Sequence, residues 1–119
     1  MRQPWIICGT AALLLLGNAA AGAHAFLDHA DPRVGSVAGA APREVTLWFT
    51  QDLEPAFSTV TVTDGTGQRV DAGSPNISGN IMRVPLRSIG TGTYKVTWHA
   101  LSVDTHTTEG AFTFGVDGR

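Results

Sequence analysis

Apolar and polar residues alternate along most of the chain after residue 23, and no stretch there repeats at the spacing of an amphipathic helix. Alternation places every second side chain on one face, which is the pattern of a half-buried β-strand. Two segments show it most clearly, with apolar faces made of Val45, Leu47 and Phe49 and of Tyr94, Val96 and Trp98. The pattern therefore predicts an all-β domain.

Further strands are expected at 58–63, 81–86 and 112–116, and the opening segment 25–29 is another candidate. Trp48 lies between two residues of the apolar face of its strand, so its side chain is expected on the outer face. We expect neighbouring residues to cover it partly. About seven short strands with turns between them are typical of a Greek-key β-sandwich or barrel.

Two stretches between these strands carry turn and loop residues. Residues 64–67 read Asp-Gly-Thr-Gly, and their glycines supply the positive φ angles of a tight turn, so 68–70 is expected to form a return strand. Residues 72–79 are rich in Gly, Ser, Pro and Asn and are predicted to form a loop.

The first 23 residues have the composition of an export signal. Arg2 precedes an apolar run, and small residues end the segment at Ala23. Such a signal is removed rather than folded, and its apolar run is shorter than the roughly 20 residues of a membrane span. We expect cleavage after Ala23 and one exported domain of residues 24–119, although cuts after Ala21 or Ala25 also fit the small-residue rule.

Removal of this leader restricts the chemistry of the mature chain. The only cysteine, Cys8, lies within the leader, so neither a disulfide nor a thiolate metal ligand is expected. The remaining 96 of 119 residues suffice for one core. Ten acidic residues against seven Lys and Arg give a net charge of −3, which disfavours a nucleic acid as partner.

Cleavage after Ala23 makes His24 the first residue, with a free α-amine beside its imidazole. These two nitrogens can chelate one ion together. Such a chelate suits the tetragonal geometry of Cu(II), which also leads the divalent affinity order for nitrogen and oxygen ligands. His24 is therefore a candidate Cu(II) ligand.

A second candidate pair is Asp104 and His106, which lie two residues apart in the run Ser-Val-Asp-Thr-His. On an extended backbone, side chains two apart project to the same side, so a carboxylate and an imidazole converge. Taken alone, an Asp-x-His pair is more often an ordinary surface feature.

Several stretches carry a resemblance to a known family. They are 24–27 (His-Ala-Phe-Leu) with 30–32, 45–49, 92–98 (Gly-Thr-Tyr-Lys-Val-Thr-Trp) and, most specifically, 102–106 with Gly110 and 112–114 behind it. At these residues the chain resembles the copper resistance protein C (CopC) family of periplasmic copper carriers, over essentially all of 24–119. The resemblance implies a Greek-key fold described as cupredoxin-like or immunoglobulin-like. It also implies one Cu(II) ion per chain, held by the amine and imidazole of His24, by Asp104 and by His106.

The same resemblance implies a role in copper homeostasis or resistance, in which copper passes to a CopD-like inner-membrane protein. Because the sequence ends at Arg119 without a membrane domain, we expect this partner to be a separate polypeptide. The carrier itself is expected to be a monomer.

Departures from the family pattern bear on the copper chemistry. Some members hold Cu(I) in a methionine-rich loop, but Met82 is the only methionine after the leader, so a Cu(II)-only protein is expected. Gln51 stands where some members have Glu, and Thr107 where many have Pro. We therefore expect different surroundings for the bound metal.

Other polar residues have both a functional and an ordinary interpretation. His29 is either a fourth nitrogen ligand or a surface histidine, and Glu109 either orients a ligand or is simply exposed. His99 is expected to be solvated or packed without touching the metal.

Two other function classes compete with a copper carrier. A polysaccharide monooxygenase shares the N-terminal histidine chelate, but it normally needs a larger chain and a flat aromatic binding face. A non-metal adhesion module predicts no copper stoichiometry. We expect a carrier and not an enzyme.

Overall fold

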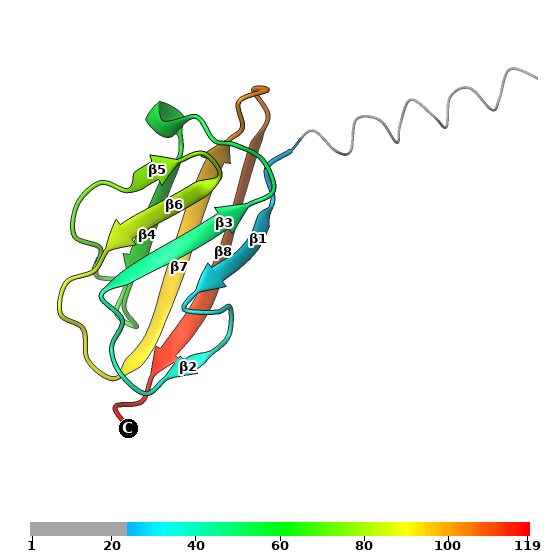
Figure 1. The fold of residues 1–119 in the computed structure, drawn as a ribbon. Coiled ribbons are helices and arrows are strands. Elements are labelled where there is room, and N and C mark those ends of the chain that lie inside the picture. Colours follow the sequence, from blue (N-terminus) through cyan, green and yellow to red (C-terminus); the bar gives the residue numbers. More distant parts are fainter. Residues whose placement is uncertain (1–23) are drawn as a thin grey trace, which may run out of the picture.

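The computed structural model describes residues 24–119, so the predicted leader lies outside the described residues. The described chain forms strands β1 (Leu27–Asp31), β2 (Val37–Ala38), β3 (Glu44–Phe49), β4 (Thr59–Thr63), β5 (Asn76–Ser78), β6 (Ile81–Pro85), β7 (Gly92–Leu101) and β8 (Thr107–Val116), with a 3-10 turn, η3, at Pro55–Phe57. Figure 1 shows this order along the chain. Among these residues no helix is long and apolar enough to cross a membrane.

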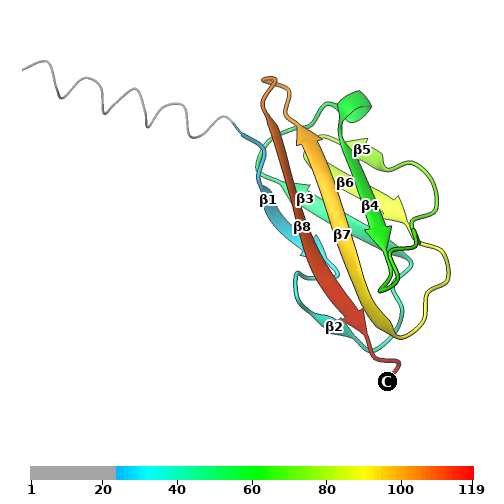
Figure 2. The ribbon, with the colours of Figure 1, turned by 180° about the vertical axis from the view of Figure 1, so that it is seen from behind.

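The strands form two four-stranded sheets, with the orders β1-β3-β6-β5 and β2-β8-β7-β4. Neighbouring strands are antiparallel except β2 and β8, which pair in parallel. Figures 1 and 2 show the two sheets lying face to face, with the C-terminus at the end opposite to the start of β1. The predicted all-β Greek-key sandwich is confirmed, with eight strands in the described part instead of about seven.

The core lies between the sheets and is made of the predicted apolar faces. Phe49 and Leu47 of β3 are 1% and 0% exposed, and Trp98 of β7 is 6% exposed. The rings of Phe49 and Trp98 meet edge to face with their centroids 5.1 Å apart. Burial of these aromatic side chains from both sheets helps to hold the sheets together.

The predicted return strand at 68–70 is reduced to one antiparallel bridge, between Arg69 and Thr63. The N–H groups of Asp64 and Val70 donate to the carbonyls of Gln68 and Val62 at 2.9 and 2.8 Å, but no longer strand forms. The carboxylate of Asp71 accepts the backbone N–H of Val62 at 2.9 Å. A side chain thus occupies the place where the carbonyl of a partner strand would accept, and no ladder continues there.

The predicted loop at 72–79 contains the short strand β5, which is the second difference from the sequence-based expectation. Its three residues pair with β6 from Asn76 opposite Arg83 to Ser78 opposite Ile81. Glycine and proline frame this strand at Gly73, Pro75 and Gly79 and so hide its pattern.

Trp48 lies on the outer face of β3 and is partly exposed, as predicted. Its indole stacks against the imidazole of His29 on β1, with ring centroids 4.3 Å apart and planes 9° from parallel. The neighbouring histidine therefore provides the partial cover.

Candidate metal centre

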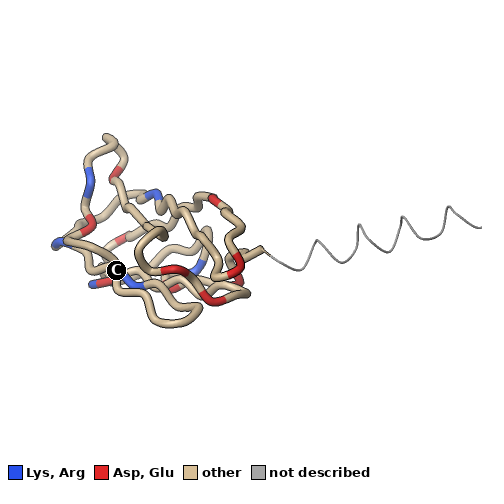
Figure 3. Tube along the Cα trace, turned by 90° about the horizontal axis from the view of Figure 1, so that it is seen from above, with Lys and Arg blue, Asp and Glu red and all other residues tan. Residues whose placement is uncertain are grey.

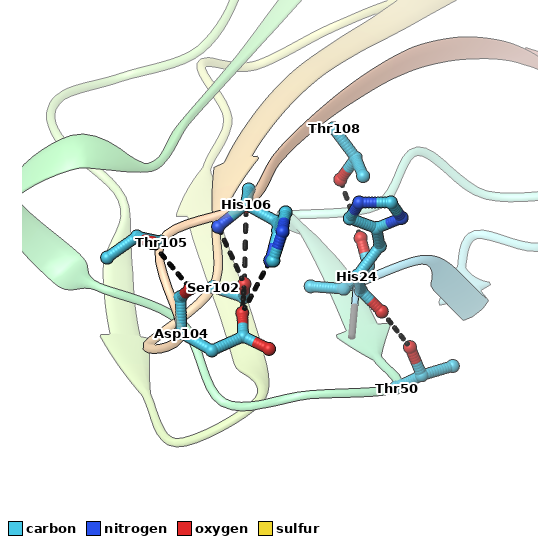
Figure 4. Close-up of polar contacts among 8 residues, drawn as sticks. His24, Thr50, Ser102, Asp104, Thr105, His106 and Thr108 are labelled. Atoms are coloured by element: carbon cyan, nitrogen blue, oxygen red, sulfur yellow. Dashed lines mark hydrogen bonds and ion pairs between the residues drawn. The ribbon is translucent and has the colours of Figure 1, made fainter. Parts of the chain in front are cut away.

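The predicted ligands come from two segments that meet at one end of the sandwich, shown in Figure 4. His24 precedes β1, whereas Asp104 and His106 lie in the connection between β7 and β8. This end lies at the top of Figure 1. The fold therefore brings residues from the two ends of the described sequence to one place.

The segment that carries His24 is anchored by its backbone. Ala25 is fully buried, and its carbonyl accepts a hydrogen bond from the Thr108 hydroxyl at 2.6 Å. The Thr50 hydroxyl donates to the His24 carbonyl at 3.3 Å and accepts the N–H of Phe26 at 2.9 Å. Two threonines, on a loop and on β8, thus fix the chain directly beside His24 (Figure 4).

The loop that carries Asp104 and His106 is a tight turn closed by its own backbone. The N–H of Ser102 donates to the His106 carbonyl at 3.0 Å, and the N–H of Thr105 donates to the Ser102 carbonyl at 2.9 Å. Thr105 has a φ of 73°, a left-handed conformation that a β-branched residue rarely adopts. This turn brings the side chains of Asp104 and His106 together.

The side chain of Ser102 positions the Asp104 carboxylate in this loop. It is fully buried, and its hydroxyl donates to the Asp104 carboxylate in a short hydrogen bond. This hydrogen bond is the main reason why the pKa of Asp104 lies below its usual range; burial opposes the shift, and the hydrogen bond and charge of His106 add to it. Asp104 is consequently a carboxylate at neutral pH, which is the state that a cation requires.

The three predicted ligands are brought together as two pairs that share His106. The imidazoles of His24 and His106 meet edge to face with centroids 4.7 Å apart. Nδ1 of His106 lies 3.4 Å from Oδ1 of Asp104. Within residues 24–119, no group of three His, Cys, Asp or Glu side chains is close enough to hold a metal ion.

The backbone nitrogen of His24 is an amide in the 119-residue chain, because Ala23 precedes it.

The remaining candidates have other partners. Nδ1 of His29 lies 2.7 Å from the Asp28 carboxylate, on the outer face beside Trp48. His99 is exposed, and its Nδ1 lies 3.1 Å from the Glu109 carboxylate. The structure therefore places Glu109 against His99, apart from the three predicted ligands.

Met82 is fully buried in the core. Its thioether therefore lies on β6 inside the sandwich, away from solvent.

Sequence reasoning missed the residues that support the centre. Ser102, Thr50 and Thr108 hold the backbone or carboxylate of the predicted ligands, but hydroxyl residues are common in strands and loops. For Ser102 a signal existed, since a small hydroxyl residue two positions before an aspartate can bond to its carboxylate.

The chain is similar to proteins of a known family. A model of the CopC domain family matches residues 27–117. Protein YobA of Escherichia coli K12 is 37% identical over 98 residues, covering 79% of each chain. Copper resistance protein C of Pseudomonas syringae pv. tomato is 35% identical over 111 residues, covering 86% of this chain and 87% of its own.

Solved structures show the same fold. The crystal structure of CopC from Methylosinus trichosporium OB3b matches with a TM-score of 0.74 and 31% identity, over 79% of this chain and 94% of that chain. The structure of PcoC, a methionine-rich copper resistance protein from Escherichia coli, matches with a TM-score of 0.71 and 31% identity, over 80% of this chain and all of that one. Two of these relatives, from Pseudomonas syringae and Escherichia coli, are named as copper resistance proteins. The protein therefore belongs to the CopC family.

Proposed function

We propose that the mature protein is a periplasmic carrier for Cu(II) that serves copper homeostasis or resistance. It binds one Cu(II) per chain through the amine and imidazole of His24, the carboxylate of Asp104 and the imidazole of His106. The approach of the His24 and His106 rings to 4.7 Å is the observation that carries the proposal. Two imidazoles and one carboxylate form the nitrogen and oxygen set that Cu(II) prefers.

Proteolysis completes this centre. Removal of residues 1–23 as an export signal converts the amide nitrogen of His24 into an amine, which adds a ligand that the full-length chain lacks. A metal that recruits this amine also draws the pairs around His106 into one coordination sphere. Because no group of three ligand side chains is formed within residues 24–119 before cleavage, the proposal requires a local rearrangement at His24.

Hand-over of copper to a CopD-like membrane protein is the second part of the proposal. A segment of the copper transport protein CutJ of Bacillus subtilis is 30% identical over 98 residues, which is 18% of that protein. A relative named for copper transport thus contains a segment similar to this domain, which supports a link with copper movement.

Native mass spectrometry of the exported protein, with and without Cu(II), tests the function. We expect a chain that starts at His24 and gains one copper ion. His24→Ala and His106→Ala should each weaken Cu(II) binding strongly in a competition titration, whereas His29→Ala serves as the matched control. A mature chain that starts at another residue, or a His24→Ala variant with full affinity, would contradict the proposal.

The oxidation state is tested separately by a Cu(I) competition titration. Since Met82 is buried in the core, we expect no tight stoichiometric Cu(I) complex. A one-to-one Cu(I) complex of high affinity would overturn the Cu(II)-only assignment.

A further inference from the structure

The end of the sandwich that holds the candidate centre is formed by residues 24–28, 50–58 and 101–109, which we call the site end. Backbone hydrogen bonds tie these segments into one surface. The N–H of Thr50 donates to Phe26 at 2.9 Å, that of Val103 to Asp52 at 3.1 Å, and that of Glu54 to Leu101 at 2.8 Å.

Charge is distributed unequally between this end and the rest of the domain. The site end carries five carboxylates and neither Lys nor Arg: Asp28, Asp52, Glu54, Asp104 and Glu109. The cationic side chains of the described residues lie elsewhere in the sequence, at Arg33, Arg43, Arg69, Arg83, Arg87, Lys95 and Arg119. Figure 3 marks both sets along the trace. The site end therefore presents a negative surface to solvent.

Three exposed apolar side chains belong to the same segments. Phe26 is 50% exposed, Val103 is 53% exposed and Phe57 is 70% exposed. Phe26 lies edge to face against the His24 ring, and Val103 directly precedes Asp104. A groove of about 460 Å³ adjoins Phe57 and runs along Thr107 and Glu109. Apolar and acidic groups thus lie on the same segments as the candidate centre.

The presence of both carboxylates and apolar side chains distinguishes a surface that attracts free copper ions from one that binds a protein partner. Carboxylates alone would attract a free copper ion, but exposed phenylalanine and valine side chains do nothing for a hydrated cation. A protein partner gains from both, because apolar contacts supply affinity while rim charges set orientation and association rate.

Resting on the proposed Cu(II) function, we propose that the site end is the docking surface for a copper-exchanging protein whose own metal site is bordered by Lys and Arg around an apolar contact. Docking end-on places the His24 and His106 ligands at the interface. Like-charged partners are repelled by the carboxylates, so the surface also selects between acceptors.

Stopped-flow transfer of Cu(II) to two synthetic acceptor peptides tests this surface. Both peptides begin with the Cu(II)-chelating tripeptide Gly-Gly-His, and one continues Leu-Lys-Leu-Lys, the other Leu-Glu-Leu-Glu. We expect the lysine peptide to accept copper about 10-fold faster at low salt, and the difference to shrink to about twofold at high salt as the charges are screened.

Two variants locate the effect on the surface. Asp52→Asn combined with Glu54→Gln should lower the ratio of the two transfer rates by about threefold or more, whereas Glu44→Gln, an exposed carboxylate outside the site end, should leave the ratio unchanged. Phe57→Ser should slow transfer to the lysine peptide, with the exposed Val34→Ser as its control. For the Asp52 and Glu54 double variant, the ratio cancels any change in the rate of Cu(II) dissociation.

Equal transfer rates to both peptides, or an unchanged ratio in the Asp52 and Glu54 double variant, would overturn the docking surface. Failure of the proposed function gives a different result, because the mature protein would then not load one Cu(II) through His24 before any acceptor is added.

Discussion

Gly110 of β8 lies directly against the indole of Trp98 on the neighbouring strand, so closely that a Cβ on Gly110 would stand 2.7 Å from Cζ2 of the ring. Trp98 in turn packs edge to face on Phe49 of the opposite sheet. The glycine therefore allows one aromatic side chain to join the two sheets, at a position three residues beyond the start of β8.

Gly110→Ala should destabilise the protein by about 1–3 kcal/mol, because the added methyl group overpacks the Trp98 ring against the core. The matched control is Gly115→Ala on the same strand, whose Cβ would make an ordinary contact 3.5 Å from Val37. Urea unfolding measures both variants. Equal stability of the two variants would show that the ring moves aside freely.

Ser102→Ala should weaken Cu(II) binding by about 10- to 100-fold, since the variant loses the hydroxyl that holds the Asp104 carboxylate. Ser58 is the matched control, because it is also buried and its hydroxyl accepts the N–H of Leu101 at 3.0 Å without contacting a predicted ligand. Ser58→Ala should cost about 1 kcal/mol of stability while the Cu(II) affinity is retained. A competition titration with unfolding of both apoproteins separates the two effects.

The decrease in the free energy of unfolding at low pH should depend on Asp71. Burial by itself would raise the pKa of this carboxyl, but hydrogen bonds from Arg69 and from the N–H of Val62, with the charge of Arg69, lower it. A lowered pKa means that the stabilisation is present above the pKa of the unfolded chain, near 4, and is lost as the pH falls through the folded value.

Asp71→Asn should therefore reduce the free energy of unfolding by about 1–2 kcal/mol at pH 7 and flatten its decline below about pH 4. The amide oxygen can still accept from Val62, so the fold is kept. Glu44→Gln, at the exposed start of β3, is the control for removal of one charge. An unchanged decrease in the free energy of unfolding at low pH in Asp71→Asn would refute the assignment.

His29→Gln should change the Cu(II) affinity by less than roughly 10-fold, which is the loss expected when a residue that supports a metal ligand is removed. We expect this small effect because the His29 ring is held by Asp28 and Trp48. The same variant should alter the fluorescence of Trp48, which loses its stacked neighbour. A large loss of affinity would show that His29 reaches the metal.

The parts of the fold that sequence predicts well are those in which one face of a strand is buried. Alternation of apolar and polar residues predicts β3 and β7 because one face of each strand is turned toward water and the other face packs against the opposite sheet. At β2 two residues suffice for a parallel pairing with β8, and so short a strand has no detectable period. Near Asp71 a side chain replaces a strand, which no pattern of apolar residues reveals.

The candidate ligands His24, Asp104 and His106 stay a prediction from the sequence, whereas the residues that support them were not predicted. The histidines and the aspartate are the side chains that bind metals, so their positions draw notice. Thr50 and Thr108 act through backbone carbonyls of residues distant in sequence, and such contacts exist only once the sheets have assembled.

The hydrogen bond from Thr108 to the buried Ala25 also limits how much of the chain must be ordered when copper binds. Only one residue precedes this anchor in a chain that begins at His24. Ordering its backbone costs about 1–2 kcal/mol of conformational entropy, whereas a longer free arm would lose that amount for each added residue. Because of the anchor at Ala25, most of the backbone entropy that chelation requires is lost when the domain folds, before the metal binds.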